Sequence, residues 1–289
     1  MQSRREFLAG TVGALAVSGA ALAEEKKLPG KTKHTRFAVN VEMWWPRERN
    51  FLKRLENAAE LGFSAVEFWP FENKDIPAVA RTCQRLKLDV AQFTAWGFKP
   101  GLNDPNNHEA FVKKIRQACV AAKQLNCKLM TVVAGDDIKG KTQKEMHAAV
   151  IEGLKKAVPI VEKEDITLIL EPMNIKVDHK GHCLYGSAPA IAICQAVGSK
   201  HVKINWDLYH MYITEQNLIE NLRKGWEWVG YLQIADHPGR NEPGTGEIDY
   251  TSVFKEIRKL KYPGYVGLEL RPKKSEEAAA WAVNRADDW

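Results

Sequence analysis

The sequence predicts an α/β protein that forms a single (β/α)8 TIM barrel, and two observations lead to this fold class. Eight short apolar segments alternate with stretches of helical spacing over about 255 of the 289 residues, which is a usual size for this barrel. These segments lack a clean two-residue alternation, as expected of strands that are covered on both faces. An open doubly wound sheet would more often carry a glycine fingerprint after its first strand, where this chain has Trp44, Trp45 and Pro46.

The first residues predict export to the periplasm by the twin-arginine (Tat) pathway. Arg4 and Arg5 form a twin-arginine signature, and a small and apolar run with a small-x-small cleavage motif follows. Residues 1–23 are therefore expected to be a signal peptide, although an amphipathic N-terminal helix is the alternative. The apolar run is short for a membrane span, so we expect none in the mature chain. Residues 24–35 are predicted to be a linker and residues 36–289 the barrel domain.

Charge and cysteine content narrow the classes of function. The net charge is +6, and lysine and arginine are scattered through helical stretches. This distribution favours small anionic substrates slightly and gives no sign of a nucleic-acid groove. The five cysteines form no CxxC pair and mostly lie in apolar stretches, so we expect buried free thiols.

In the N-terminal half, four apolar segments are predicted to be strands. They are residues 36–43, 65–69, 88–94 and 128–134. Pro46 and Pro70 stop the first two, because proline cannot donate to a sheet. Apolar side chains recur at helical spacing between and after these strands. The expected helices are residues 47–61, 76–87 and 108–125. A stretch rich in Gly, Pro and Asn, residues 96–107, is long enough to be a functional loop.

The C-terminal half repeats the alternation. Its predicted strands are residues 167–171, 202–207, 229–235 and 265–270. Thr142 and Glu145 form a capping box that opens a helix reaching about residue 164, and Pro159 should kink or shorten this helix. Ser187 is expected to cap a helix that ends near Gly198. The remaining helices are expected at residues 214–225, 251–261 and from Ser275 onward.

Side chains that carry oxygen end the last four predicted strands. They are Glu171, Asp207, Gln233 and Glu269. The C-terminal ends of barrel strands meet at the active-site face, where three crowded carboxylates would repel one another. A divalent cation relieves this repulsion, and hard oxygen ligands point to Mg²⁺ or Mn²⁺. Capping of the following helices would explain one such residue more easily than four in succession.

Other polar and aromatic side chains are expected near this face. Arg240 could pair a substrate carboxylate through two hydrogen bonds, or lie on the surface of a mobile loop. His210 could equally bind a substrate oxygen or be a satisfied buried histidine. Surface positions are favoured for His179 and His182, and a structural hydrogen bond for Glu67. The tryptophans that could wall the mouth, or pack in the core, are Trp44, Trp45, Trp69 and Trp96.

From Phe37 to about Leu270 the chain resembles the xylose isomerase-like barrels, and within them the hydroxypyruvate isomerase family. The long segment formed by residues 233–248 is the specific part of this resemblance. The shorter segments are residues 37–40, 65–68, 170–174, 207–211 and 268–270.

The resemblance implies a divalent metal held by the four strand-end residues, with Glu171 and Glu269 as the proton-transfer pair. It also implies that His210 and Arg240 contact the substrate. The implied reaction interconverts hydroxypyruvate and 2-hydroxy-3-oxopropanoate (tartronate semialdehyde) through an enediolate. Gln233 lies where the related ketose 3-epimerases usually carry histidine, which favours the hydroxypyruvate isomerase branch. The expected partner is thus a small hydroxy-keto acid or sugar, and a homo-oligomer is compatible with the sequence.

Three other functions stay open from the sequence. A ketose 3-epimerase or other sugar isomerase would use the same metal and glutamates on a longer substrate. An apurinic-endonuclease-like hydrolase shares the barrel but typically gathers more histidines around several metals. A non-catalytic exported sugar-binding protein would bind without turnover. Residues 175–186 fit the pattern of neither isomerase branch.

Overall fold

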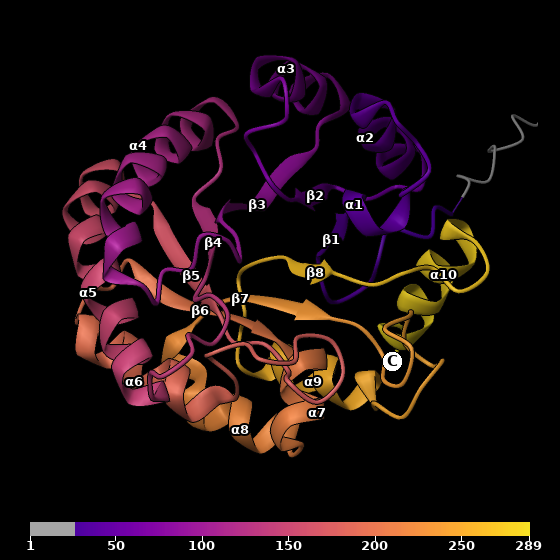
Figure 1. Cartoon of the computed structure of the whole chain (residues 1–289). Coiled ribbons are helices and arrows are strands. Elements are labelled where there is room, and N and C mark those ends of the chain that lie inside the picture. The colour runs from indigo at the N-terminus through magenta and orange to yellow at the C-terminus, as the bar shows by residue number, and fades with distance from the viewer. Residues whose placement is uncertain (1–26) are drawn as a thin grey trace, which may run out of the picture.

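The computed structural model describes residues 27–289, in which eight parallel strands close into a barrel (Figure 1). The strands are β1 (Phe37–Asn40), β2 (Ala65–Phe68), β3 (Asp89–Trp96), β4 (Leu129–Val133), β5 (Thr167–Glu171), β6 (Val202–Asp207), β7 (Val229–Ile234) and β8 (Val266–Leu268). Each strand pairs with the next in the sequence, and β8 pairs with β1. The predicted fold class is confirmed, and the predicted signal peptide lies outside the described residues.

Helices surround the barrel (Figure 1). They are α1 (Val41–Trp44), α2 (Phe51–Glu60), α3 (Ile76–Leu86), α4 (His108–Gln124), α5 (Gln143–Glu164), α6 (Ser187–Val197), α7 (Leu208–Glu215), α8 (Leu218–Gly225), α9 (Tyr250–Lys259) and α10 (Glu276–Ala286). Two short 3-10 helices are η1 (Pro105–Asn107) and η2 (Trp226–Trp228). None of the helices in the described part of the chain combines the length and apolar character that a membrane crossing requires.

Two helices begin directly at strand ends, which the sequence analysis did not predict. The first strand stops at Asn40, because the Asn40 side chain accepts the N–H groups of Glu42 and Met43 and caps α1. Trp44 therefore ends a helix and not a strand. Asp207 caps α7 in the same way, through the N–H groups of Tyr209 and His210. Asp207 is thus both a strand-end carboxylate and a helix cap.

Helix ends elsewhere confirm one prediction and correct two. The capping box of Thr142 and Glu145 is present at the start of α5. Pro159 does not end this helix early, since α5 continues to Glu164. Ser187 is not the cap of α6, because Gly186 holds that position and no side chain caps the helix. The Ser187 N–H instead donates to Glu215 Oε2 at 3.0 Å.

A chain of buried polar side chains crosses the interior of the barrel. Asn40 Nδ2 donates to Glu67 Oε1 at 3.0 Å, and Gln233 Nε2 donates to the same oxygen at 2.8 Å. Asn205 Nδ2 donates in turn to Gln233 Oε1 at 2.6 Å. Gly267 on β8 leaves room for this chain, because a Cβ there would lie 2.3 Å from Glu67 Oε2. Glu67 thus has the structural hydrogen bonds that its place inside a strand predicted.

The cysteines are all buried and unpaired, as expected from their apolar surroundings. Burial raises the pKa of every thiol, to about 11 for Cys119 and to about 12 for the other four. In the folded protein the cysteines are therefore protonated, unreactive thiols.

The described part of the predicted linker packs on the C-terminal end of the chain. The N–H groups of His34 and Thr35 donate to Asp287 Oδ2 at 2.7 and 3.0 Å. The His34 ring also stacks on Trp289, with 3.9 Å between the ring centroids. These contacts join the two ends of the described chain.

Candidate active site

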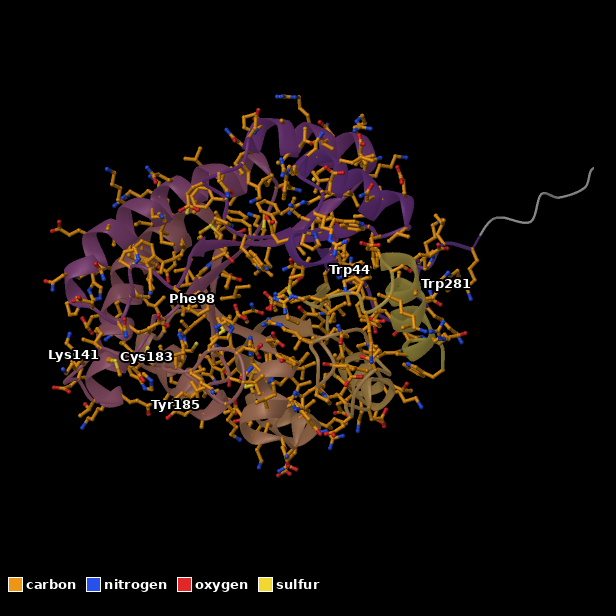
Figure 2. The ribbon with its side chains drawn as sticks, turned by 45° about the vertical axis from the view of Figure 1, so that its right-hand side comes forward. Trp44, Phe98, Lys141, Cys183, Tyr185 and Trp281 are labelled. Carbon is orange, nitrogen blue, oxygen red and sulfur yellow. The ribbon has the colours of Figure 1, made fainter. Side chains whose placement is uncertain are left out.

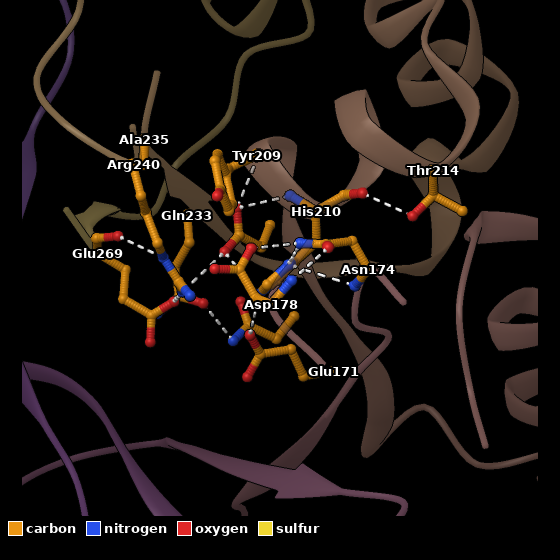
Figure 3. Close-up of polar contacts among 12 residues, drawn as sticks. Glu171, Asn174, Asp178, Tyr209, His210, Thr214, Gln233, Ala235, Arg240 and Glu269 are labelled. Carbon is orange, nitrogen blue, oxygen red and sulfur yellow. Dashed lines mark hydrogen bonds and ion pairs between the residues drawn. The ribbon is translucent and has the colours of Figure 1, made fainter. Parts of the chain in front are cut away.

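Three carboxylates and one imidazole converge at the C-terminal end of the barrel (Figure 3). Glu171 and Asp207 are the last residues of β5 and β6, and Glu269 directly follows β8. Together with His210 in the first turn of α7, they place one potential ligand atom each within 4.8 Å of one another, and all four residues are buried. The convergence expected from the strand ends is present for these three acids.

The fourth predicted ligand, Gln233, is beside this cluster but its amide is already engaged. Asp207 and Gln233 are register partners on β6 and β7. Both ends of the Gln233 amide take part in the buried polar chain, through Asn205 and Glu67. An amide oxygen has a second lone pair, so a role for Gln233 as a ligand stays a prediction.

The electrostatics of the cluster fit a divalent cation. Burial first, and then the charges of Glu269 and Asp207, raise the pKa of Glu171 well above its usual value. Burial and Glu269 raise the pKa of Asp207 to about 8. Asp207 Oδ2 is buried without a hydrogen-bond partner. A hard cation would offset the repulsion and give this oxygen a partner, so the residues present fit Mg²⁺ or Mn²⁺.

The hydrogen bonds of His210 indicate which ring nitrogen carries its proton. The Asn174 backbone N–H donates to His210 Nδ1 at 3.3 Å, so Nδ1 is an acceptor. Burial lowers the pKa of His210 well below its usual value, and the neutral ring must then carry its proton on Nε2. Nε2 lies 3.6 Å from Asp207 Oδ2 and 3.9 Å from Glu171 Oε1. A protonated Nε2 donates hydrogen bonds and does not bind a metal.

Arg240 contacts the same cluster and is not a mobile surface residue. Its guanidinium pairs with Glu269 Oε2 and lies 3.8 Å from Asp207 Oδ2. The guanidinium carbon also lies 5.1 Å from the centre of the Tyr209 ring, within cation–π range. Only 11% of the Arg240 side chain is exposed. The arginine therefore balances the charge of the acids beside it.

A residue to which the sequence analysis gave no role, Asp236, fixes the conformation of the loop that carries Arg240. Its buried carboxylate accepts hydrogen bonds from five backbone N–H groups. These belong to His237, Gly244, Thr245, Gly246 and Ile248. The Arg240 N–H donates to the Asp236 carbonyl at 2.9 Å. A short acidic residue opening a Gly-rich stretch was the available signal in the sequence.

Above the cluster lies a cavity of about 450 Å³. Its lining includes Glu171, Glu269, His210 and Arg240, together with Trp69, Phe98 and His179. Trp69 Nε1 donates to Glu269 Oε1 at 3.1 Å. Of the four tryptophans that could have walled the mouth, only Trp69 lines the cavity, whereas Trp44 and Trp96 are fully buried in the core.

The loop after β5 brings two histidines inward that were expected at the surface. His182 is 1% exposed, so that prediction is wrong. His179 stacks on Phe98 with 4.9 Å between ring centroids, and its ring lies 5.3 Å from that of His210. Figure 2 labels Phe98 and Cys183 on the same side of the molecule. His179 is thus the residue of segment 175–186 that lines the cavity.

Comparisons with known proteins agree with this fold. Residues 55–285 match the family model described as xylose isomerase-like TIM barrel. The chain is 34% identical to hydroxypyruvate isomerase of Escherichia coli (strain K12), covering 84% of this chain and 96% of that protein. It is 30% identical to 2-oxo-tetronate isomerase of Cupriavidus necator, over 84% and 95% of the two chains. A solved structure titled AP endonuclease, family 2, from Brucella melitensis superposes with a TM-score of 0.80 and 26% identity, covering 85% and 96%.

Proposed function

The chain belongs to the xylose isomerase-like TIM barrel family and is an isomerase, and on that premise we propose that it interconverts hydroxypyruvate and 2-hydroxy-3-oxopropanoate. The observation that carries this proposal is the meeting of Glu171 and Glu269 at one buried cluster that opens into the cavity. The relative named hydroxypyruvate isomerase supports the choice of substrate.

The reaction moves a carbonyl between adjacent carbons, which two carboxylates can perform. One glutamate removes a proton from C3 of hydroxypyruvate, and a proton is returned to C2 of the resulting enediolate. The hydroxyl proton moves from O3 to O2, so the atoms balance. Glu269 accepts hydrogen bonds from Trp69 and Arg240, whereas Glu171 accepts none from the described residues. The two carboxylates therefore meet the substrate in different environments, as an acid and a base require.

Two donors are available to the oxygens on which negative charge develops. The protonated Nε2 of His210 is buried and has no hydrogen-bond partner among the described residues. The Arg240 guanidinium keeps N–H groups beyond those that bind Glu269. Donors that are fixed in place before the reaction stabilise developing charge at little reorganisation cost.

Glu171, Asp207 and Glu269, with Gln233 beside them, would hold Mg²⁺ or Mn²⁺. When bound, such an ion supplies positive charge that stabilises an enediolate. The raised pKa values of Glu171 and Asp207 and the unpaired Asp207 Oδ2 support this part of the proposal.

Solvent exchange tests the proposal directly. The protein is loaded with Mg²⁺ or Mn²⁺ and incubated in D2O with hydroxypyruvate, with 2-oxo-tetronate and with neutral ketoses. We expect deuterium at carbon in hydroxypyruvate, and its loss in Glu171→Gln and Glu269→Gln. Glu220→Gln is the matched control, because Glu220 is exposed on α8 and, among residues 27–289, pairs only with Lys224. Exchange confined to ketoses would select a ketose 3-epimerase, and undiminished exchange in Glu171→Gln would overturn the mechanism.

Export by the Tat pathway is a separate proposal, which rests on Arg4 and Arg5. Fractionation of cells that express the full chain should place the shortened protein in the periplasm. The double substitution Arg4→Lys with Arg5→Lys should retain it in the cytoplasm. Equal distribution of both proteins would count against this route.

A further inference from the structure

Arg271 follows Glu269 by two residues and lines the same cavity. We propose that the Arg271 guanidinium binds the carboxylate of the substrate and thereby selects a hydroxy-keto acid over a neutral ketose. This inference rests on the proposed function, because it specifies the class of substrate at that site. It gives the role of carboxylate binding to a different arginine from the one that the sequence indicated.

The two arginines of the cavity differ in what their charges already contact. Arg240 is buried and paired with Glu269, with Asp207 nearby. Arg271 is exposed, and its side chain makes no hydrogen bond or ion pair with any residue among 27–289. A guanidinium that is already neutralised gains less from an incoming anion than an unpaired one does. An anionic group that enters the cavity therefore finds its strongest free partner at Arg271.

The backbone of Arg271 is held in a defined place. Its N–H donates to the Arg240 carbonyl at 2.9 Å, and its own carbonyl accepts from Asn241 Nδ2 at 2.6 Å. Both partners belong to the loop that Asp236 organises. The same loop thus holds the backbone of both arginines in place. The Arg240 side chain contacts the carboxylate cluster, and the Arg271 side chain lies at the cavity surface.

The balance of charge around the cavity also favours an anionic substrate. Glu171, Asp207 and Glu269 bring three negative charges, which a bound divalent cation and Arg240 together would neutralise. Arg271 is then the surplus positive charge of the lining. A substrate with one carboxylate completes this balance, whereas a neutral ketose leaves the guanidinium without a partner.

The test compares Arg271→Gln and Arg271→Lys with wild type. Lys274→Gln is the matched control, because it removes a nearby exposed positive charge that does not line this cavity. KM and kcat are measured with hydroxypyruvate, and deuterium exchange is measured with neutral ketoses. Calorimetry with glycerate, a carboxylate that lacks the carbonyl and cannot isomerise, reports binding without turnover.

We expect Arg271→Gln to raise KM for hydroxypyruvate about tenfold or more, as loss of a charge-assisted pair does, with kcat within about threefold. Glycerate binding should weaken in parallel, Arg271→Lys should restore part of the loss, and Lys274→Gln should match wild type. Unchanged KM and glycerate affinity in Arg271→Gln would overturn the inference and leave the isomerase function standing. Exchange by wild type with neutral ketoses alone would overturn the proposed function itself.

Discussion

Substitution of Asp236 by asparagine should unfold or loosen the loop that carries Arg240. The Asp236 carboxylate accepts three backbone N–H groups on Oδ2 and two on Oδ1. An asparagine side chain has only one acceptor oxygen, so at least two of these donors, of which only the Ile248 N–H is fully buried, lose their partner. Each buried donor left unsatisfied costs about 1–3 kcal/mol. Because water can reach most of these partly buried donors, the expected loss in the free energy of unfolding is about 1–3 kcal/mol.

Asp249→Asn is the control for this experiment. Asp249 caps α9 by accepting the Ser252 N–H at 3.1 Å, and asparagine caps helices about as well as aspartate. Its cost should stay within about 1 kcal/mol. Urea unfolding followed by circular dichroism measures both variants, and amide hydrogen exchange of residues 244–246 detects a loop that opens while the barrel stays folded.

Unfolding and amide exchange together test whether the Asp236 hydrogen bonds hold the loop. We expect either a lower free energy of unfolding or faster exchange at residues 244–246, and in both cases a higher KM because Arg240 loses its anchor. An Asp236→Asn protein that unfolds within about 1 kcal/mol of wild type, with unchanged amide protection, would show that the five hydrogen bonds do not hold the loop.

Three more predictions concern the cluster and the barrel interior. A raised carboxyl pKa means that the folded state holds its proton more tightly than the unfolded state does, so the free energy of unfolding of the metal-free protein should fall by about 1.4 kcal/mol per pH unit through Asp207 as the pH rises from about 4 to about 8. Glu171 should lower it in the same direction. The Tm of the metal-free protein, measured across this pH range, should fall in the same way, and added Mn²⁺ should reduce that fall. A metal-free Tm that does not change with pH would contradict the raised carboxyl pKa values. Gly267→Ala should lower Tm, because the added Cβ would lie 2.3 Å from Glu67 Oε2. A Tm equal to that of wild type would mean that the Glu67 side chain can move away at no cost. Trp69→Phe removes the hydrogen bond to Glu269 and should lower kcat about three- to thirtyfold at unchanged Tm, measured by single-turnover kinetics.

The position of the catalytic face could be predicted from the sequence because it follows from local patterns. Parallel strands bring their C-terminal ends together, so the acids that end β5 and β6 and the one that follows β8 had to meet once eight such units were recognised. Asn40 was placed inside the first predicted strand and Asp207 at the end of the sixth, although asparagine and aspartate also cap helices. Their second role explains why α1 and α7 were missed.

The directions of the side chains could not be predicted, because partners distant in the sequence determine them. Gln233 points to Glu67, which lies 166 residues away along the chain. Arg240 adopts a positive φ of 56°, a conformation that depends on the loop around Asp236. His182 is buried against Phe98 from another loop. In each case the local sequence does not contain the partner that determines where the side chain points.

Because the five thiols are buried only in the folded protein, it matters whether folding or thiol oxidation comes first. An unfolded chain would expose all of them with ordinary reactivity, and their odd number means that complete pairing within one molecule is impossible. Oxidation before folding would therefore yield a mixture of mispaired and cross-linked chains. A chain whose barrel has closed first offers an oxidant no accessible thiolate. Folding of the barrel thus protects the thiols from oxidation, and the protein can enter an oxidising medium unchanged only after it has folded.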